Sequence, residues 1–321
     1  MKAIRVHAYG GNDAMVLDDV ADPVAGEGEY VVRVRAAGVN PVDWKIVRGH
    51  LAKGYPTTLP FVPGWDLAGE VIARGHGARR FAVGDRVFGY LRRPTIAHGT
   101  FAEQVAAPEC YLAAMPAKAS FLEAAALPLV TLTSLQALRA AGVSAGQRVL
   151  VVGASGGTGA AAVQLARILG AEVAGVASAK NHDFVRGLGA AAVYDYAGAT
   201  PDGIPGVPAG AFDVVYDCVG GETIRAARPA LREGGHAVSI VSRTPPGWTD
   251  LGARLHYVFV EPDSAQLGEI ARWFDAGRLV THVEATFPLA RAAEALTRSE
   301  QGRTRGKIVV SIDDAPAPLS A

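Results

Sequence analysis

The 321-residue sequence predicts an α/β fold in which a β-rich first third precedes a doubly wound parallel sheet. In the first third, glycine and proline separate short β-rich runs, a pattern typical of a barrel or a sandwich. After residue 120, strand and helix patterns alternate, which is typical of a parallel sheet. The length suits two domains better than a single core.

Four short runs carry the β pattern of the first domain, residues 1–120: Tyr30–Val34, Gly69–Ala73, Asp85–Tyr90 and Thr100–Val105. Turn signals such as Gly84-Asp85 separate these runs. The stretch SFLEAAALPLVTLTSLQALRAAG then carries apolar residues at helical spacing, with Ser120 as the N-cap and Glu123 three residues later. This change of period marks the predicted end of the first domain.

Alternating strands and helices define the second domain, residues 121–261. The predicted strands are RVLVVGA, AEVAGVAS, AAVYDY, FDVVYDCVG, HAVSIVS and LHYVFVE, and the predicted helices are TGAAAVQLARILG, NHDFVRGLG and TIRAARPALRE. Residues 262–321 return to helix, strand, helix and a final strand: AQLGEIARWFDAG, HVEATFP, LARAAEALTRSEQG and KIVVSI. We expect the last segment, Asp313–Ala321, to be a disordered tail.

Composition narrows the function classes. Lys and Arg number 31, as do Asp and Glu, so the formal net charge is zero and nothing points to a nucleic acid or an acidic membrane as partner. No segment approaches the ~20 apolar residues that span a bilayer, and the start has no apolar run of signal-peptide length. Cys110 and Cys218 are too few for a four-thiolate zinc lobe. We expect a cytoplasmic protein that acts on a small molecule.

A glycine-rich turn follows the first strand of the second domain. Ala154, Gly156 and Gly159 have the spacing of the dinucleotide fingerprint, with alanine in the first place. The intervening residues are Ser155, Gly157 and Thr158. Such a turn lets backbone N–H groups and a helix N-terminus approach a pyrophosphate. An ordinary tight βα turn is the alternative, but the position between a buried strand and an apolar helix favours cofactor binding.

The residue that ends the second strand indicates which cofactor binds. NAD sites place Asp or Glu there to bind the ribose hydroxyls, whereas this strand ends at Ser178, followed by Ala179 and Lys180. A hydroxyl and an ammonium would hold a 2′-phosphate that a carboxylate would repel. The sequence therefore predicts NADPH. The alternatives are that Lys180 is a solvated lysine at a helix start and that Asp183 turns inward.

Several motifs in fixed order resemble those of the medium-chain dehydrogenase/reductase superfamily. They are GVNPVDWKIVRG, PGWDLAGEV, FAVGDRVFG, GASGGTGAAAVQLAR, YDCVGGET and RGKIVV, and the match runs from about Met1 to Ile312. The chain is most similar to the zinc-free quinone oxidoreductase branch, which includes zeta-crystallin. This resemblance implies a GroES-like β-barrel catalytic domain and an inserted Rossmann domain. It also implies a homodimer through the Leu255–Val260 strand.

The resemblance further implies a site without a metal ion. The first zinc-ligand cysteine of the family falls within GVNPVD, which has no cysteine, and the histidine of the family's Gly-His-Glu motif corresponds to Trp65. Zinc stabilises the alkoxide in simple alcohol oxidation, so its loss fits an acceptor that is already electron-poor. We expect a quinone, an enone, an enal or an enoyl thioester.

Three residues are expected near the substrate, and the resemblance implies the first of them. Asn40 lies near the nicotinamide and the acceptor, and Trp65 and Tyr55 are expected to line the acceptor pocket. A turn at Asn40-Pro41 and simple packing of Trp65 are the alternatives. For Asp43 and Arg48 we expect a structural ion pair.

Further residues are expected at the cofactor. Tyr196 would lie near the 2′-phosphate, and Cys218 and Val219 would follow the ribose through their backbone. Ser239, Ile240 and Val241 would line the nicotinamide pocket, while Thr133 and Lys307 match family residues near the cofactor. A helix-core threonine and a strand-start lysine remain the alternatives for Thr133 and Lys307.

The sequence therefore predicts an oxidoreductase that reduces quinones or α,β-unsaturated carbonyl compounds with NADPH and without zinc. One alternative is an enoyl (thioester) reductase in a biosynthetic pathway. Another is a low-turnover NADPH-binding protein with a structural or regulatory role. The sequence names no side chain as proton donor, and water is our candidate.

Overall fold

The computed structural model describes residues 1–312, which divide into two compact units. The first contains Met1–Leu129 and the described residues from Pro262 onward, and the second is Val130–Glu261. The predicted boundary after residue 120 falls at the start of helix α2, while the chain remains in the first unit until Leu129. The predicted tail, Asp313–Ala321, lies outside the described residues.

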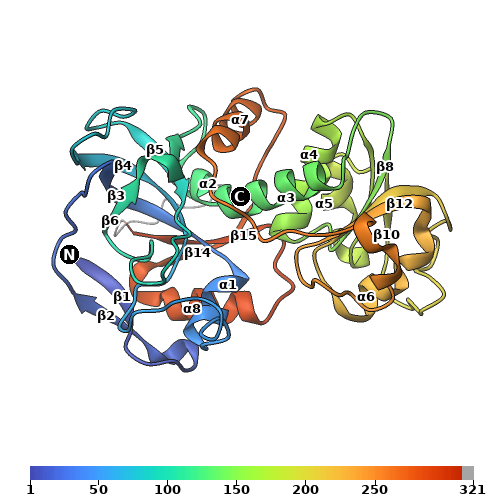
Figure 1. The fold of residues 1–321 in the computed structure, drawn as a ribbon, viewed down its shortest axis with the longest axis horizontal. Coiled ribbons are helices and arrows are strands. Elements are labelled where there is room, and N and C mark those ends of the chain that lie inside the picture. Colours follow the sequence, from blue (N-terminus) through green and yellow to red (C-terminus); the bar gives the residue numbers. More distant parts are fainter. Residues whose placement is uncertain (313–321) are drawn as a thin grey trace. The chain divides into compact units, whose positions relative to one another are not determined.

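The first unit is built on a seven-stranded sheet with the order β14-β15-β3-β4-β5-β7, in which β6 also pairs with β3 (Figure 1). Its strands are β3 (Glu29–Val39), β4 (Asp66–Arg74), β5 (Arg86–Tyr90), β6 (Gln104–Pro108), β7 (Leu112–Ala114), β14 (Val283–Pro288) and β15 (Lys307–Ser311). A separate antiparallel pair is formed by β1 (Lys2–Val6) and β2 (Met15–Asp19). The helices are α1 (Pro41–Val47), α2 (Phe121–Ala125), α7 (Ser264–Asp275) and α8 (Ala292–Glu300).

Strand β3 is the centre of this sheet because it pairs with β15, β4 and β6. Register shifts between Val31 and Val32 and before Ala36 interrupt its ladder with β4, and such bulges bend a strand. The predicted run Thr100–Val105 is wrong in its first part. Strand β6 begins only at Gln104, because the preceding residues contribute no more than an isolated bridge between Ala102 and Ala3.

One helix was not predicted from the sequence, and one predicted helix is divided in two. Asn40-Pro41 begins helix α1, in which Asn40 is the N-cap and Pro41 occupies the first turn, where its missing N–H costs nothing. The single helical stretch after Ser120 is two helices, α2 and α3 (Pro128–Ala140), because Pro128 can begin a helix but not continue one. The predicted capping pair is present: the Ser120 hydroxyl accepts from Glu123 N at 3.2 Å, and the Glu123 carboxylate accepts from Ser120 N at 2.9 Å.

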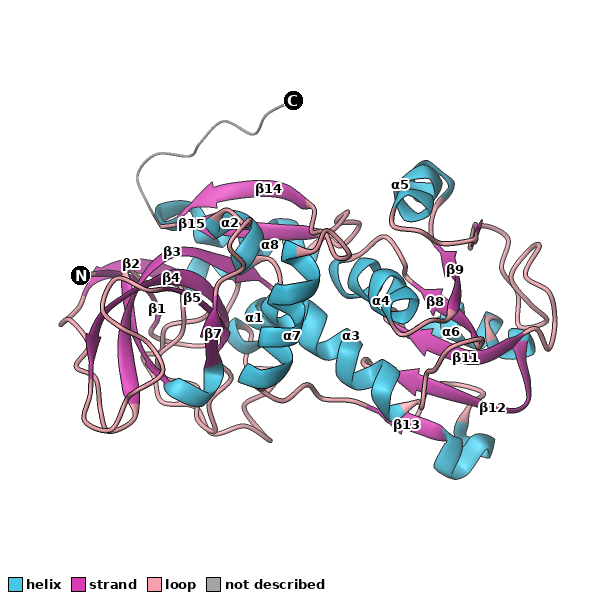
Figure 2. Ribbon diagram, turned by 90° about the horizontal axis from the view of Figure 1, so that it is seen from above, coloured by secondary structure: helices cyan, strands magenta, loops and turns pink. Residues whose placement is uncertain are grey.

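The second unit is a doubly wound sheet of six parallel strands with the order β10-β9-β8-β11-β12-β13, most of which lie side by side in Figure 2. The strands are β8 (Arg148–Val152), β9 (Glu172–Val176), β10 (Ala192–Tyr194), β11 (Phe212–Asp217), β12 (Leu231–Ser239) and β13 (Leu255–Tyr257). The helices are α3 from Val130 onward, α4 (Gly157–Ile168), α5 (His182–Gly187) and α6 (Gly221–Ala226). This strand order is that of a dinucleotide-binding fold.

Two element boundaries in the second unit differ from the prediction. The predicted helix TIRAARPALRE is α-helical only as far as Ala226. Pro229 lies in a short 3₁₀ helix that precedes β12. The strand LHYVFVE is regular only at Leu255–Tyr257, because its partner β12 ends at Ser239. The core beside these strands includes Trp248, whose Nε1 donates to Ile224 O at 2.9 Å.

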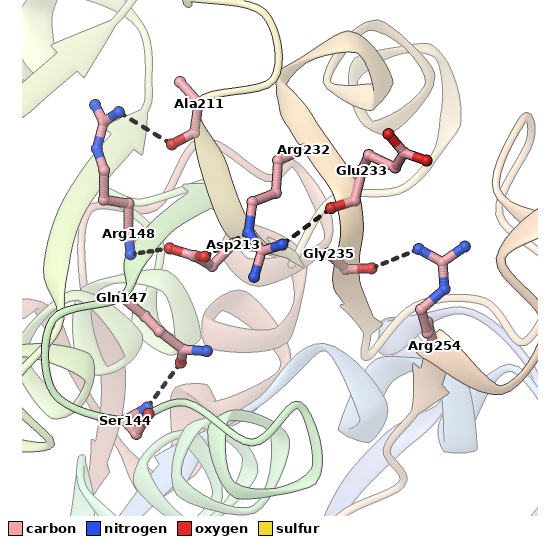
Figure 3. Close-up of polar contacts among 9 residues, drawn as sticks. All are labelled: Ser144, Gln147, Arg148, Ala211, Asp213, Arg232, Glu233, Gly235 and Arg254. Atoms are coloured by element: carbon pink, nitrogen blue, oxygen red, sulfur yellow. Dashed lines mark hydrogen bonds and ion pairs between the residues drawn. The ribbon is translucent and has the colours of Figure 1, made fainter.

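A charged network ties together the amino ends of β8, β11 and β12 (Figure 3). The Asp213 carboxylate accepts from Arg148 N at 2.7 Å and from Arg232 Nε at 2.6 Å. Partial burial acts to raise the pKa of Asp213, but these two hydrogen bonds lower it below its ordinary value. The amino ends are thus occupied by structural contacts, and in open α/β sheets ligands bind at the carboxyl ends. Within the described residues, no helix combines the length and apolarity that crossing a bilayer requires.

Candidate functional site

The glycine turn between β8 and α4 leaves space in front of the helix. A Cβ on Gly159 would lie 2.1 Å from Gly153 O, so this glycine lets α4 pack against the end of the strand. Gly153 has φ +87° and also contacts Val219, which would lie 2.5 Å from an added Cβ. At Gly156, in contrast, an added Cβ would meet only Gly153 O, at 3.6 Å. Packing therefore requires two glycines, and the third keeps the helix N-terminus open.

The other residues of the turn are held in place around this opening. Ala154 is fully buried and its N–H donates to Val176 O at 3.0 Å. Thr158 O accepts from the Ser134 hydroxyl of α3 at 2.9 Å. Gly157 and Thr158 form the first turn of α4, whose unpaired N–H groups and positive dipole end suit an anion. The cradle fits a pyrophosphate.

Ser155 and Ser178 come together at the end of β9. Asn181 Nδ2 donates to both hydroxyls, at 3.2 Å each. Lys180 is exposed beside them, and Tyr196, after β10, is 48% exposed. Hydroxyl, amide and ammonium groups are thus available beside the end of β9, and Asn181 is a member that the sequence prediction missed.

Two acidic residues nearby have structural partners. Asp183 is exposed and forms an ion pair with Arg186 at 2.9 Å, so the alternative in which it turns inward is wrong. Asp195 accepts from Ala179 N at 3.2 Å and from Ala197 N at 2.9 Å. These bonds tie the loop after β10 to the segment after β9.

Asp217 organises the carboxyl ends of β11 and β12. Its buried carboxylate accepts from Val219 N at 2.9 Å, Gly220 N at 2.7 Å and the Ser239 hydroxyl at 2.7 Å. The same hydroxyl accepts from Val241 N at 3.1 Å. Val219 and Val241 are 50% and 46% exposed, which leaves an apolar surface at the strand ends.

The remaining predicted cofactor residues of this unit lie in buried or partly buried surroundings. Ile240 follows Ser239, and its N–H donates to Asp217 O at 3.2 Å. Thr133 is buried in α3. Burial raises the pKa of the Cys218 thiol well above its ordinary value, with the Asp217 charge adding to the effect, which disfavours the thiolate form.

A buried polar cluster joins Asn40, Asp66 and Lys307 in the first unit. Lys307 Nζ donates to Asn40 Oδ1 at 2.5 Å and to Val39 O at 2.6 Å, and lies 3.6 Å from Asp66 Oδ2. Asn40 Nδ2 donates to Asp66 Oδ2 at 2.8 Å, and Leu129 N donates to Asp66 Oδ1 at 2.9 Å. The pairing of β15 with β3 brings these distant residues together.

Asp43 adds a second buried carboxylate to this cluster. Its Oδ2 accepts from Asn40 N at 2.7 Å, and it is completely buried. Burial raises the pKa of Asp43 to about 7 and that of Asp66 to about 6, although Lys307 opposes both shifts. Burial likewise lowers the pKa of Lys307. One ammonium thus faces two carboxyls, and a proton on Asp43 makes the cluster neutral.

Aromatic rings lie beside this cluster. Trp65, which precedes Asp66, has its ring centroid 6.1 Å from that of Tyr55 and 6.0 Å from that of Tyr90. The Tyr55 hydroxyl donates to Arg93 O. The three rings form one aromatic cluster, in which Trp65 and Tyr90 are buried, so the two predicted pocket aromatics lie together.

The predicted ion pair between Asp43 and Arg48 is wrong. Arg48 Nε instead lies 2.7 Å from Glu300 Oε1 of α8, and Asn12 Nδ2 donates to the same carboxylate at 3.0 Å. Asp43 is in the first turn of α1 and Arg48 is the C-cap, so the two side chains leave opposite ends of a short helix. Asp43 is used to cap the helix start.

Comparisons with known proteins identify the family. The alcohol dehydrogenase GroES-like domain model matches residues 26–117, and the zinc-binding dehydrogenase model matches residues 188–310. The chain is 33% identical to the chloroplast envelope quinone oxidoreductase homolog of Arabidopsis thaliana, over 97% of this chain and 98% of that protein. The chain belongs to the medium-chain dehydrogenase/reductase superfamily. Within it, the chain falls in the quinone oxidoreductase branch and is an oxidoreductase.

Two further matches support the assignment to this superfamily. The NADPH-dependent alkenal/one oxidoreductase of Arabidopsis thaliana is 32% identical over 97% of this chain and 79% of its own length. The structure of the quinone oxidoreductase from Coxiella burnetii superposes with a TM-score of 0.87 at 30% identity, covering 98% of this chain and 99% of that one. The predicted GroES-like and Rossmann architecture is therefore confirmed.

Some members of the medium-chain dehydrogenase/reductase superfamily bind zinc, and the donor set here does not fit that ion. Trp65 offers no ligand atom, and the Lys307 ammonium is bonded to the oxygens of Val39 and Asn40. Across residues 1–312, no three His, Cys, Asp or Glu side chains are grouped as a metal site. We derive no step through a metal ion.

Asp66 and Asp217 are the main residues that the sequence prediction missed. A signal existed for Asp66, because it follows Trp65 and so takes the acidic place of the superfamily's Gly-His-Glu motif. For Asp217 the signal was a carboxylate directly before Cys218 and Val219, which the sequence prediction placed along the ribose. Of the predicted residues, Lys307 lies with Asn40 in the first unit, whereas the glycine turn belongs to the second.

Proposed function

We propose that the chain reduces quinones and α,β-unsaturated carbonyl compounds with NADPH, without a metal ion. The observation that carries this proposal is the Lys307–Asn40–Asp66 cluster, in which an ammonium, an amide and a carboxylate contact one another and no thiolate or imidazole takes part. A site without a Lewis acid favours acceptors activated by conjugation. The names of the relatives, a quinone oxidoreductase homolog and an alkenal/one oxidoreductase, support the same acceptor class.

The preference for NADPH rests on the end of β9. Ser178 and Lys180 supply a hydroxyl and an ammonium, and Tyr196 lies in the loop that follows β10. The acids nearby have structural partners: Asp195 accepts from two backbone N–H groups, and Asp183 pairs with Arg186. The cradle of Ala154, Ser155 and the following residues to Gly159 would hold the pyrophosphate. NADPH, when bound, supplies the hydride.

The remaining predicted residues receive roles in binding and orientation. Cys218 and Val219 would contact the ribose through the turn that Asp217 fixes, and Ser239, Ile240 and Val241 would border the nicotinamide. Thr133 and Lys307 are proposed at the cofactor, as in the family. Trp65 and Tyr55 would form an apolar wall for a planar acceptor. Water would supply the proton that completes the reduction.

We further propose a homodimer through the Leu255–Val260 segment. Strand β13 is the last strand of its sheet, and Phe259 is 40% exposed beside it. An exposed apolar edge is prone to pair with a second copy.

An acceptor panel tests the proposed function. Purified protein is mixed with NADPH or NADH and with quinones, enones, enoyl thioesters or primary alcohols, and loss of the reduced-cofactor absorbance is followed. We expect turnover of the conjugated acceptors, faster with NADPH, and unchanged by a chelator. Turnover of plain alcohols that a chelator abolishes would contradict the proposal.

A further inference from the structure

The side-chain amide of Asn40 is held at both ends by opposite charges. Its oxygen accepts from the Lys307 ammonium at 2.5 Å, and its nitrogen donates to the Asp66 carboxylate at 2.8 Å. All three side chains are buried, with Asn40 1% and Lys307 4% exposed. Hydrogen bonds to charged groups are about twice as strong as neutral ones.

These two contacts select one orientation of the amide. Turning it by 180° would place its NH₂ group against the Lys307 ammonium, which has only donors. It would also place the amide oxygen against the Asp66 carboxylate, which is already an acceptor from Leu129 N. Because both contacts would become repulsive, Lys307 and Asp66 together hold the Asn40 amide in a single orientation.

One N–H of this amide remains free for another acceptor. The amide nitrogen has two N–H groups, and Asp66 takes one of them. The second N–H has no acceptor among residues 1–312. A buried donor without a partner is uncommon and costs stability, so its retention calls for an explanation.

The position of Asn40 is fixed as well as its orientation. As the N-cap of α1, it has its backbone N–H bound to the Asp43 carboxylate at 2.7 Å. Asp66 is in turn held by Leu129 N. The ring of Trp65, the residue before Asp66, lies beside the ring of Tyr55 in the aromatic cluster. The free N–H therefore belongs to a rigid group, and the residue before Asp66 is part of an aromatic cluster, whose rings suit contact with a flat, conjugated molecule.

We propose that Lys307 and Asp66 are positioning residues that fix the Asn40 amide so that its second N–H donates to the oxygen of the bound acceptor. This inference rests on the proposed function, because that oxygen gains negative charge as a conjugated acceptor is reduced. A fixed donor stabilises such charge without reorganisation. The link to the ammonium draws electron density from the amide and makes its N–H a better donor. Lys307 thus acts through Asn40.

A double-mutant cycle in the intact enzyme tests this arrangement. The single variants are Asn40→Ala, Lys307→Met and Asp66→Asn, and each of the latter two is combined with Asn40→Ala. We expect kcat for an enone to fall about 10- to 100-fold in each single variant, since small misplacements have effects of that size. Each double variant should be no slower than Asn40→Ala, because removing the amide leaves nothing to position. The inference would be overturned if the losses of kcat in the single variants multiplied in the double variants, or if Asn40→Ala kept full activity.

Controls separate this role from general damage. Arg298→Met removes the Arg298–Glu284 ion pair elsewhere in the same unit and should leave kcat unchanged. The dissociation constant of NADPH should change less than threefold in Asn40→Ala and in Asp66→Asn. A large loss of NADPH affinity in Asn40→Ala would assign the amide to the cofactor and overturn the inference. Asp66→Asn has the same shape as the parent residue and serves if Lys307→Met does not fold.

A spectroscopic readout keeps the inference separate from the proposed function. In ¹⁵N-labelled protein without ligands, the Asn40 side-chain NH₂ is assigned by its loss in Asn40→Ala. We expect two well-separated proton signals with slow solvent exchange, which merge or exchange faster in Lys307→Met and Asp66→Asn. Unchanged signals would overturn the positioning role. If no conjugated acceptor is reduced but the signals respond, the proposed function fails while the clamp on Asn40 stands.

Discussion

Replacing Gly156 and Gly159 by alanine separates cofactor binding from packing at the glycine turn. Gly156 has φ −75° and ψ 167°, which alanine adopts readily, and its added Cβ would meet only Gly153 O at 3.6 Å. Removing backbone freedom at such a site stabilises a protein by about 0.4–1 kcal/mol. Gly159→Ala instead forces a Cβ to 2.1 Å from Gly153 O, and overpacking of this kind costs about 1–3 kcal/mol.

The two substitutions should therefore differ in stability but agree in NADPH binding. In Gly156→Ala the methyl group occupies the space in front of α4 and displaces the pyrophosphate from the N–H groups. Losing one hydrogen bond to a charged group costs about 1.5–3 kcal/mol, or roughly 10- to 150-fold in affinity. Gly159→Ala should lose similar affinity because the helix start is pushed away.

Urea unfolding and titration of NADPH fluorescence measure the two quantities. We expect Gly156→Ala to be at least as stable as the parent protein and to bind NADPH at least tenfold more weakly. Gly187→Ala, at a glycine of α5 with nothing within 4 Å of its added Cβ, is the matched control and should retain full affinity. Unchanged NADPH affinity in Gly156→Ala would refute the assignment of this turn as the pyrophosphate cradle.

Three further predictions follow from the same structure. Replacing Ser178 and Lys180 by alanine should lower the NADPH-to-NADH preference in kcat/KM at least tenfold, since the 2′-phosphate loses its partners; an unchanged ratio would place it elsewhere. Burial raises the pKa of Asp43 to about 7 from 3.8. The buried neutral carboxyl therefore adds its full stabilisation to the folded state below about pH 4, and this stabilisation is lost as the pH rises through 7. Asp43→Asn should therefore gain stability relative to the parent by about 4 kcal/mol between pH 4 and 8 in urea unfolding, and parallel pH profiles would contradict the shift. Phe259→Glu places like charges across the proposed dimer contact and should give monomers in analytical ultracentrifugation, whereas an unchanged oligomer would move the interface.

Local patterns predicted several elements of the second unit and the start of α2 in the first. Apolar runs and the Gly156–Gly159 spacing gave β8, α4 and β9, and the Ser120–Glu123 pair gave the start of α2, because these features depend on neighbours in sequence. The break at Pro128 was missed because the apolar periodicity continues through it. The shortened β13 could not be predicted, since its length depends on where β12 ends.

The polar cluster shows what the sequence did not reveal. Asn40 and Lys307 are 267 positions apart, and only the pairing of β15 with β3 brings them within hydrogen-bond distance. The Asp43–Arg48 pairing was expected from proximity along the chain, but burial at the helix start directs Asp43 to Asn40 N. Contacts that depend on sheet register or on which end of a helix is buried need the folded chain.

Transfer of a label tests the central proposal, metal-free reduction of a conjugated acceptor, most directly. Chelator-treated protein is incubated with NADPH deuterated at C4 and a simple enone, and the product is analysed by NMR. We predict one deuterium at the former β-carbon and a rate equal to that of untreated protein. Unlabelled product, or activity lost on chelation and restored by zinc, would contradict the account.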